Sequence, residues 1–162
     1  MPKNLLPIIA ALFVMLFLWV STVPILSWYE YSGHEEELRD ATDRWERSGV
    51  SSYRYRYQID SYMASPVTDP VIVEISDKQL RSVRSVMTGK FVELAESPNV
   101  PLTIEDLYNT IAVAIATRPY AIEIAYDFEL GFPTSISIDY NELTHDEVNY
   151  SVTGFEELAS GD

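Results

Sequence analysis

The densest group of side chains capable of chemistry lies near the C-terminus, where residues 139–147 read DYNELTHDE. Calcium prefers several oxygen ligands, which carboxylate and amide side chains supply. The spacing departs from the helix-flanked calcium loop, because Leu143 takes a ligand position and no glycine follows it. The pattern favours an ordinary acidic loop and leaves calcium binding as an alternative. The candidate ligands are Asp139, Asn141, Glu142, Asp146 and Glu147.

Tyrosines form the second candidate group. Tyr53, Tyr55 and Tyr57 recur at every second residue, which places them on one face of a predicted strand. Alternating tyrosines favour a core whose hydroxyl groups reach its rim, and a pocket or peptide-binding face is the alternative. Arg54 and Arg56 lie on the opposite face, where we expect them to pair with neighbouring acids. The possible binding face comprises Tyr53, Tyr55, Tyr57, Tyr126, Tyr140 and Tyr150.

Motifs that would indicate catalysis are missing. His34 and His145 each lie in an acidic segment without a nucleophile motif beside them, which favours solvated surface histidines. The sequence has no glycine-rich phosphate loop, so neither a nucleotide nor any other cofactor is indicated. We therefore predict a protein that is not an enzyme and has no catalytic residues. A hydrolase built on paired carboxylates is a remote alternative, because acidic side chains are abundant.

The composition excludes several classes of function. The chain has 162 residues, with 25 acidic and 11 basic side chains, a formal charge of −14 and no cysteine. Disulfides, cysteine-based metal sites and lipid attachment through cysteine are therefore excluded. Nucleic-acid binding is not expected, because it requires a basic surface. Lys3 is the only charged side chain before Glu30, so the net charge lies on residues 30–162.

The N-terminal segment predicts a membrane anchor. Residues 5–23 read LLPIIAALFVMLFLWVSTV, and 16 of these 19 residues are apolar. As a helix at about 1.5 Å per residue they would extend roughly 28 Å, close to the thickness of a bilayer's hydrocarbon core. We predict a transmembrane signal-anchor over residues 1–29, with the N-terminus in the cytoplasm and residues 30–162 in the periplasm or outside the cell. The alternative is a cleaved signal and a secreted domain.

One α+β domain is predicted after the anchor. Period-two alternation indicates strands at 53–59, 71–75, 122–128, 136–140 and 148–152, and a tight turn before residues 80–87 with Gly89 after them indicates a further strand there. Alternating strands are typical of antiparallel sheets, so we expect about six strands with two helices on one face. The order is helix, three strands, helix, three strands, which some inhibitor proteins with repeated halves also show. For residues 80–87 a helix is the alternative, because their apolar residues also fit a helical spacing.

Capping residues bound the two predicted helices. Ser32 and Glu35 form a capping box before a helix at 34–48, and Gly49 is suited to end it. Its apolar face is narrow, so we expect this helix to lie on the surface. Thr103 caps a second helix at 104–117, whose wide apolar stripe predicts deep packing.

The C-terminal half carries a family resemblance. The blocks TIEDLYNTI, IEIAYDFELGFPTSISIDY and DEVNYSV lie within residues 103–152, and Trp45 lies eight residues before Tyr53. Together they resemble a family of small bacterial secreted or membrane-anchored proteins, known as a domain of unknown function, over residues 43–155. The resemblance implies an extracytoplasmic α+β domain and brings no activity. Its best signature is Tyr126-Asp127, Gly131-Phe132-Pro133, Asp139-Tyr140 and Asp146-Glu147.

The resemblance also sets a limit on function. Members often carry a cysteine pair just after the first strand, where this chain has Ser61-Tyr-Met-Ala-Ser65. Any role tied to that pair is absent here. We predict a membrane-anchored extracytoplasmic domain that binds a protein or envelope partner. The alternative is a module that binds a small ligand or calcium through the 139–147 loop or the tyrosine face.

Overall fold

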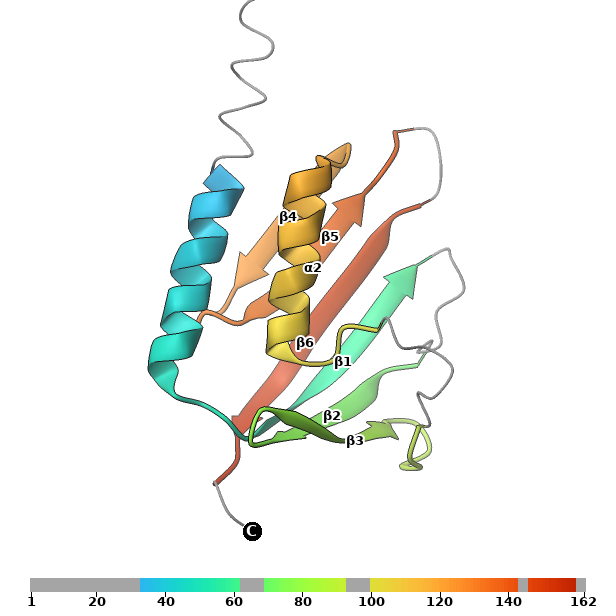
Figure 1. The fold of residues 1–162 in the computed structure, drawn as a ribbon. Helices are drawn as coiled ribbons and strands as arrows, with labels where there is room; N and C mark the ends of the chain where they lie inside the picture. Colours follow the sequence, from blue (N-terminus) through green and yellow to red (C-terminus); the bar gives the residue numbers. More distant parts are fainter. Residues whose placement is uncertain (1–32, 62–68, 93–99, 143–145, 160–162) are drawn as a thin grey trace, which may run out of the picture. The chain divides into compact units, whose positions relative to one another are not determined.

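The computed structural model describes residues 33–61, 69–92, 100–142 and 146–159. A helix over residues 33–48 precedes β1 (Tyr53–Ser61), β2 (Val71–Ser76) and β3 (Gln79–Ser85). Helix α2 (Ile104–Thr117) then precedes β4 (Ala121–Tyr126), β5 (Pro133–Asp139) and β6 (Val148–Glu157). The strands form one antiparallel sheet in the order β3-β2-β1-β6-β5-β4 (Figure 1). The predicted α+β class and the predicted order of elements are confirmed.

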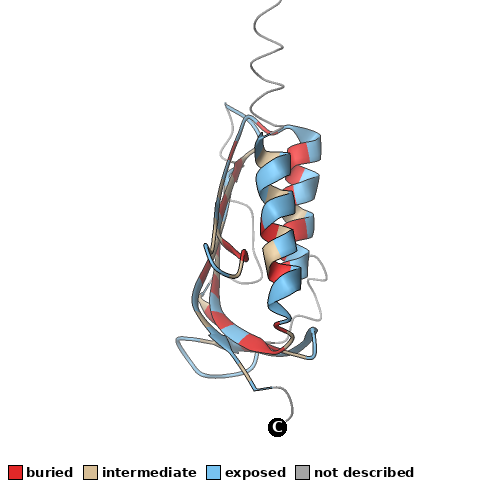
Figure 2. Cartoon of the chain, turned by 90° about the vertical axis from the view of Figure 1, so that its left-hand side faces the viewer, coloured by how far each residue is buried: buried red, intermediate tan, exposed pale blue. Residues whose placement is uncertain are grey.

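Both helices pack on the same face of the sheet, and no described element covers the other face (Figures 1 and 2). The buried residues lie between the helices and the sheet, because alternate strand positions point toward the helices. This arrangement confirms the expected two layers. The largest fully buried strand residues are Tyr53, Tyr55, Tyr57, Val71, Val73, Ile75, Pro133, Ile136 and Ile138.

Helix α2 has well-formed ends. Thr103 accepts a hydrogen bond from the backbone N–H of Asp106 at 3.0 Å, and the Asp106 carboxylate accepts one from the N–H of Thr103 at 3.0 Å. This capping box satisfies backbone groups that the first turn leaves without partners. Arg118 takes a left-handed conformation at the C-terminal end, with φ of 53°. The predicted bounds of this helix are confirmed.

The helix at 33–48 lies on the sheet through a narrow buried face. Ala41 and Trp45 are buried, at 0% and 4% exposure. The Trp45 ring packs edge-on against Tyr53 at 5.3 Å and Phe155 at 5.9 Å between ring centroids. Most of its other residues are exposed, as the narrow apolar face predicts, and the large Trp45 ring fixes the helix on the sheet.

Residues 80–87 form a strand up to Ser85, as predicted. Their helical spacing has a physical cause. The register between β2 and β3 shifts at Glu74/Ile75, so Leu80 opposes Ile75 and Val83 opposes Val73. This irregularity turns two residues three apart toward the same face of the sheet.

A second bulge, in β6, changes which residues face the helices. Arg54 opposes Glu156 and Arg56 opposes Thr153, so Gly154 and Phe155 lie together opposite a single residue of β1. Gly154 has φ of 60°, a conformation that glycine adopts without strain. The bulge places Phe155 toward the core, where its ring stacks on Phe132 at 4.4 Å.

The predicted anchor at residues 1–29, and Ser32 as a cap, lie outside the described residues. In the part of the chain that the structure describes, no helix is long and apolar enough to cross a membrane. The site of the family's cysteine pair likewise lies mostly outside the described ranges, since only Ser61 falls within them.

Candidate functional site

Three of the candidate tyrosines fill the core. Tyr53, Tyr55 and Tyr57 are at most 1% exposed, and burial raises the pKa of each phenol above its usual value. The Tyr55 hydroxyl donates to the backbone carbonyl of Leu102. The Tyr53 hydroxyl accepts the N–H of Ile104 at 3.2 Å. These two tyrosines therefore join β1 to the start of α2, and all three rings belong to the core.

The other three tyrosines do not complete an open face. Tyr126 and Tyr150 are half-buried, and burial is the main cause that raises the pKa of each. Tyr140 follows β5 and is 44% exposed. Tyr140 also contributes to the raised pKa of Tyr150, which places these two side chains near each other. The structure thus separates the six tyrosines into a buried group on β1 and single residues elsewhere.

The acidic candidates accept hydrogen bonds from their own loop. The Asp139 carboxylate accepts the backbone N–H of Asn141 at 3.1 Å. Asp146 accepts that N–H at 3.2 Å and the Asn141 side-chain amide at 2.7 Å. Glu142 lies near Tyr120 and raises the pKa of its phenol. Three of the five candidates therefore form a hydrogen-bonded loop, consistent with the interpretation of residues 139–147 as an ordinary acidic loop.

Glu147 comes directly after Asp146 in the chain. It lines a depression of about 260 Å³ together with Asp60, Ser61 and Asn149. Among the described residues, no group of three or more histidine or acidic side chains is placed to hold a metal ion. Residues 143–145, which include His145, lie outside the described ranges.

The signature around residues 126–133 supports the packing of the helix at 33–48. The Asp127 carboxylate accepts the backbone N–H groups of Glu129 and Leu130, at 3.0 and 2.8 Å. Gly131 has φ of 89°, and a methyl group there would lie 2.3 Å from the carbonyl oxygen of Ala41. The Tyr108 hydroxyl lies within hydrogen-bonding distance of the carbonyls of both Gly131 and Ala41. Only glycine allows the turn to approach the helix this closely.

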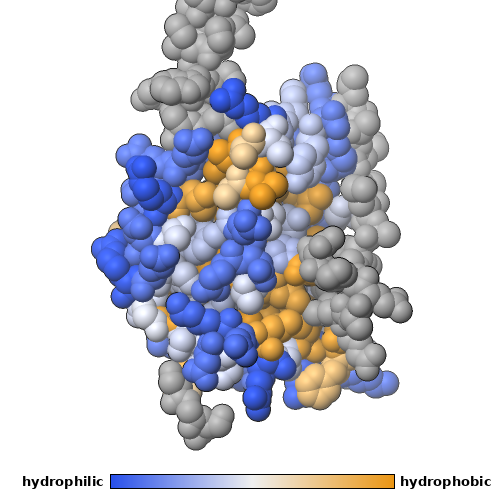
Figure 3. Space-filling view, in the orientation of Figure 1, coloured by the Kyte–Doolittle hydropathy of each residue, from blue (hydrophilic) through white to orange (hydrophobic). Residues whose placement is uncertain are grey.

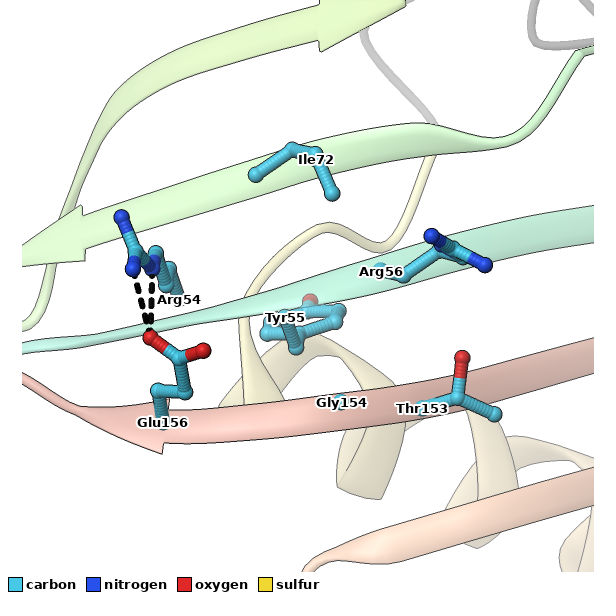
Figure 4. A pocket seen from close by; sticks show the side chains of 7 residues that line it. All are labelled: Arg54, Tyr55, Arg56, Ile72, Thr153, Gly154 and Glu156. Atoms are coloured by element: carbon cyan, nitrogen blue, oxygen red, sulfur yellow. Dashed lines mark hydrogen bonds and ion pairs between the residues drawn. The ribbon is translucent and has the colours of Figure 1, made fainter. Parts of the chain in front are cut away.

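A depression lies on the face of the sheet that the helices do not cover. It has a volume of about 510 Å³ and is bounded by side chains of β1, β2 and β6 (Figure 4). Gly154 has no side chain, which leaves the centre of the β6 border open. The lining residues are Arg54, Tyr55, Arg56, Ile72, Thr153, Gly154 and Glu156.

Arg54 has the acidic partner that alternation predicted. Glu156 stands opposite it on β6, and the Arg54 guanidinium contacts the Glu156 carboxylate at 2.6 Å (Figure 4). Glu74 stands opposite it on β2. Arg54 is therefore flanked by acids on both sides, as cross-strand pairing favours.

Arg56 differs from Arg54 although both share the same face. Its cross-strand neighbours are Thr153 on β6 and Ile72 on β2, neither of which is charged. Within the described ranges, Arg56 makes no hydrogen bond or ion pair. The expectation that both arginines pair with acids is wrong for Arg56, because uncharged residues stand opposite it on both neighbouring strands.

Sequence reasoning missed this depression. It identified Arg54 and Arg56 as outward-facing but not the strand that would lie beside them. The sequence does carry a signal for the β-bulge beside the depression. Residues 153–156 combine a glycine with a break in the alternation of apolar and polar residues inside a strand. Recognising the partner strand required the β1–β6 register, which joins residues about a hundred positions apart.

The helix-bearing side has a different surface. Hydrophilic residues alternate there with two apolar patches, one over the C-terminal half of α2 and one in the lower right of the view (Figure 3). On α2, Val113 is 55% exposed. Nothing in the described residues indicates what would cover either patch, whereas the depression on the opposite face has defined charges and hydrogen-bonding groups.

Comparison with known proteins supports a family assignment alone. Neither the curated proteins nor the solved structures that were compared yield a match to the chain. Residues 37–157 match a family of unknown function, DUF6174, and include most of the helix at 33–48, α2 and all six strands. Because this match spans most of the sequence, the chain belongs to the DUF6174 family.

Proposed function

We propose that the protein is a membrane-anchored extracytoplasmic domain that binds a protein or cell-envelope partner and does not catalyse a reaction. The observation that supports this function best is the 510 Å³ depression in the uncovered face of the sheet. The helices fill one face with apolar contacts, which leaves the other face available for a partner (Figure 2).

The chemistry of the depression favours recognition. It combines two guanidinium groups, a hydroxyl, a carboxylate and an aliphatic side chain, which together give directional and apolar contacts. Arginine is enriched where surfaces bind partners, because its planar group makes several hydrogen bonds at once. The anchor at residues 1–29 would hold this surface close to the membrane.

Cross-linking in cells tests the role of the uncovered face. A photoreactive amino acid replaces Thr153 in one variant of the full chain and Asn109, exposed on α2, in the control. We expect a covalent adduct of defined mass from position 153 and none from position 109. Equal adducts from both positions, or none from position 153, would contradict binding through this face.

Labelling of single cysteines tests the location, since the chain has no native cysteine to interfere. We expect a membrane-impermeant maleimide to label Glu129→Cys in intact cells and Asn4→Cys only after lysis. Labelling of both in intact cells, or of neither, would contradict the proposed orientation. Loss of residues 1–29 from the mature chain would instead indicate the secreted alternative.

A further inference from the structure

We infer that the row of residues Thr153, Arg56, Ile72 and Arg84, on the uncovered face of the sheet, binds the carboxylates of an acidic protein segment. This inference rests on the proposed function of that face and adds the chemistry of the partner. We call these four residues the arginine row.

Strand register places the four residues side by side. Arg56 pairs with Thr153 on β6 and with Ile72 on β2, and Ile72 pairs with Arg84 on β3. All four face away from the helices, because Arg56 alternates with the buried tyrosines of β1. With neighbouring strands about 4.8 Å apart, the two arginines lie roughly 10 Å from each other at the backbone.

The charge along the arginine row is uncompensated. The neighbouring row contains Arg54 between Glu156 and Glu74, so acids already surround its cation. The arginine row has two cations and no acid, although the chain as a whole carries a formal charge of −14. In so acidic a chain, two exposed arginines without an acid in their row leave room for an external carboxylate.

The depression already holds one carboxylate of the protein itself. Both Nε and a terminal nitrogen of Arg54 contact the same oxygen of Glu156, at 2.8 and 2.6 Å. This contact shows the geometry that the strand surface allows for a guanidinium and a carboxylate. Arg56 can present its guanidinium in the same way, with the Thr153 hydroxyl as an additional donor (Figure 4).

Apolar groups at the row favour a protein segment over a free anion. Ile72 separates the two arginines, and the guanidinium of Arg84 lies 3.9 Å from the centre of the exposed Phe91 ring. A segment with two acidic side chains flanking an apolar one would match the charges and Ile72 together. A polyphosphate backbone has no apolar group to place there.

A pair of peptides tests this chemistry on the purified full chain in a neutral detergent. The probe is a decapeptide in which two leucines are flanked by glutamates, and the control peptide has glutamine for each glutamate. Binding is measured by fluorescence anisotropy at low salt. We expect the acidic peptide to bind and the glutamine peptide to bind at least roughly tenfold more weakly, because charge-assisted hydrogen bonds are lost.

Four variants locate the site. Arg56→Gln should weaken binding of the acidic peptide roughly tenfold, and Thr153→Val a few-fold, since each removes donors. Glu156→Gln should strengthen binding a few-fold, because it releases Arg54 from an internal competitor. Arg39→Gln, in the exposed part of the helix at 33–48, removes the same charge elsewhere and should change nothing. Unchanged urea midpoints verify that the variants remain folded.

Equal weakening by Arg56→Gln and Arg39→Gln would overturn the inference, because binding would then follow net charge alone. Displacement of the peptide by inorganic phosphate at an equal concentration of anionic groups would overturn it too, since the site would then be a general anion site. If either of these two results is found but position 153 still forms its cross-linked adduct, the uncovered face binds a partner and the binding of carboxylates by the arginine row is wrong. If no adduct forms, the proposed function fails irrespective of the peptide result.

Discussion

Tyr55 and Tyr57 stand two residues apart on the same face of β1, yet their hydroxyl groups have different surroundings. The Tyr55 hydroxyl donates to the carbonyl of Leu102 at the start of α2. The buried Tyr57 hydroxyl has no hydrogen-bond partner among the described residues. A phenol buried without a partner loses its hydration and gains nothing in return, so the two hydroxyls should affect stability in opposite directions.

A pair of matched substitutions checks this difference. Tyr55→Phe should lower the free energy of unfolding by about 1–3 kcal/mol, because it leaves the buried Leu102 carbonyl without its donor. Tyr57→Phe should change it by less than about 0.5 kcal/mol or raise it, because no bond is lost. Urea unfolding followed by tryptophan fluorescence measures both. A larger loss from Tyr57→Phe than from Tyr55→Phe would contradict the contacts.

Sequence and structure agree at this scale where a residue's role is set by its neighbours in the chain. Thr103 was predicted to cap the helix that follows it, and it accepts the backbone N–H of Asp106. Asp127, at a strand end, likewise accepts backbone N–H groups of the residues that follow it. Arg54 and Arg56 show the limit. Alternation identifies their common face, but whether an acid stands opposite depends on a strand from the other end of the chain.

At the scale of elements, two glycines perform different tasks at similar backbone angles. Gly154 lies in the bulge of β6 with open space around it. Gly131 lies in the β4–β5 connection, where it touches the helix at 33–48 through the Ala41 carbonyl. The first accommodates a change of register, and the second brings a turn against a helix.

Alanine substitutions separate the two tasks. Gly154→Ala should cost about 1–2 kcal/mol, the penalty for a left-handed backbone with a side chain. Gly131→Ala should cost more, roughly 3 kcal/mol or above, because the methyl group also collides with backbone atoms. Thermal unfolding of both variants, with Gly49→Ala as a second glycine in open space, measures the difference. Equal costs at the three positions would show that the close approach at Gly131 is not maintained in solution.

The bounds of α2 and the existence of each strand follow from local patterns, which is why they could be predicted. Two features could not. The bulge at Glu74/Ile75 made β3 resemble a helix, because the helical spacing of Leu80 and Val83 arises from the partner strand. The burial of Trp45 depends on Tyr53 and Phe155, and Phe155 faces the core only because of the β6 bulge.

The whole molecule has two layers, with a row of tyrosines at their interface. Desolvation raises the pKa of Tyr53, Tyr55 and Tyr57 above the ordinary value of 10.0. The folded chain therefore keeps phenolic protons that the unfolded chain loses as the pH rises above that value. The contribution of these protons to stability is present below pH 10.0 and decreases above it.

Alkaline titration should show this coupling. We expect the free energy of unfolding to fall above pH 10.0 by about 1.4 kcal/mol per pH unit for each of these buried tyrosines. The ionisation of the buried phenols, seen in the near-ultraviolet absorbance, should coincide with loss of helical circular dichroism. Ionisation of all eleven tyrosines while the fold persists would contradict the buried placement.

The bulge at Gly154 acts as a half-period phase slip in a strand that otherwise repeats every two residues. Up to Val152 the even positions point toward the helices, and from Phe155 onward the odd ones do. Deleting Gly154 would remove the slip and restore strict alternation, with Phe155 opposite Tyr55 and still toward the helices, and with Glu156 still opposite Arg54. The slip is therefore the place where β6 should tolerate the loss of a single residue, because the parity of the strand on both sides of it is then kept.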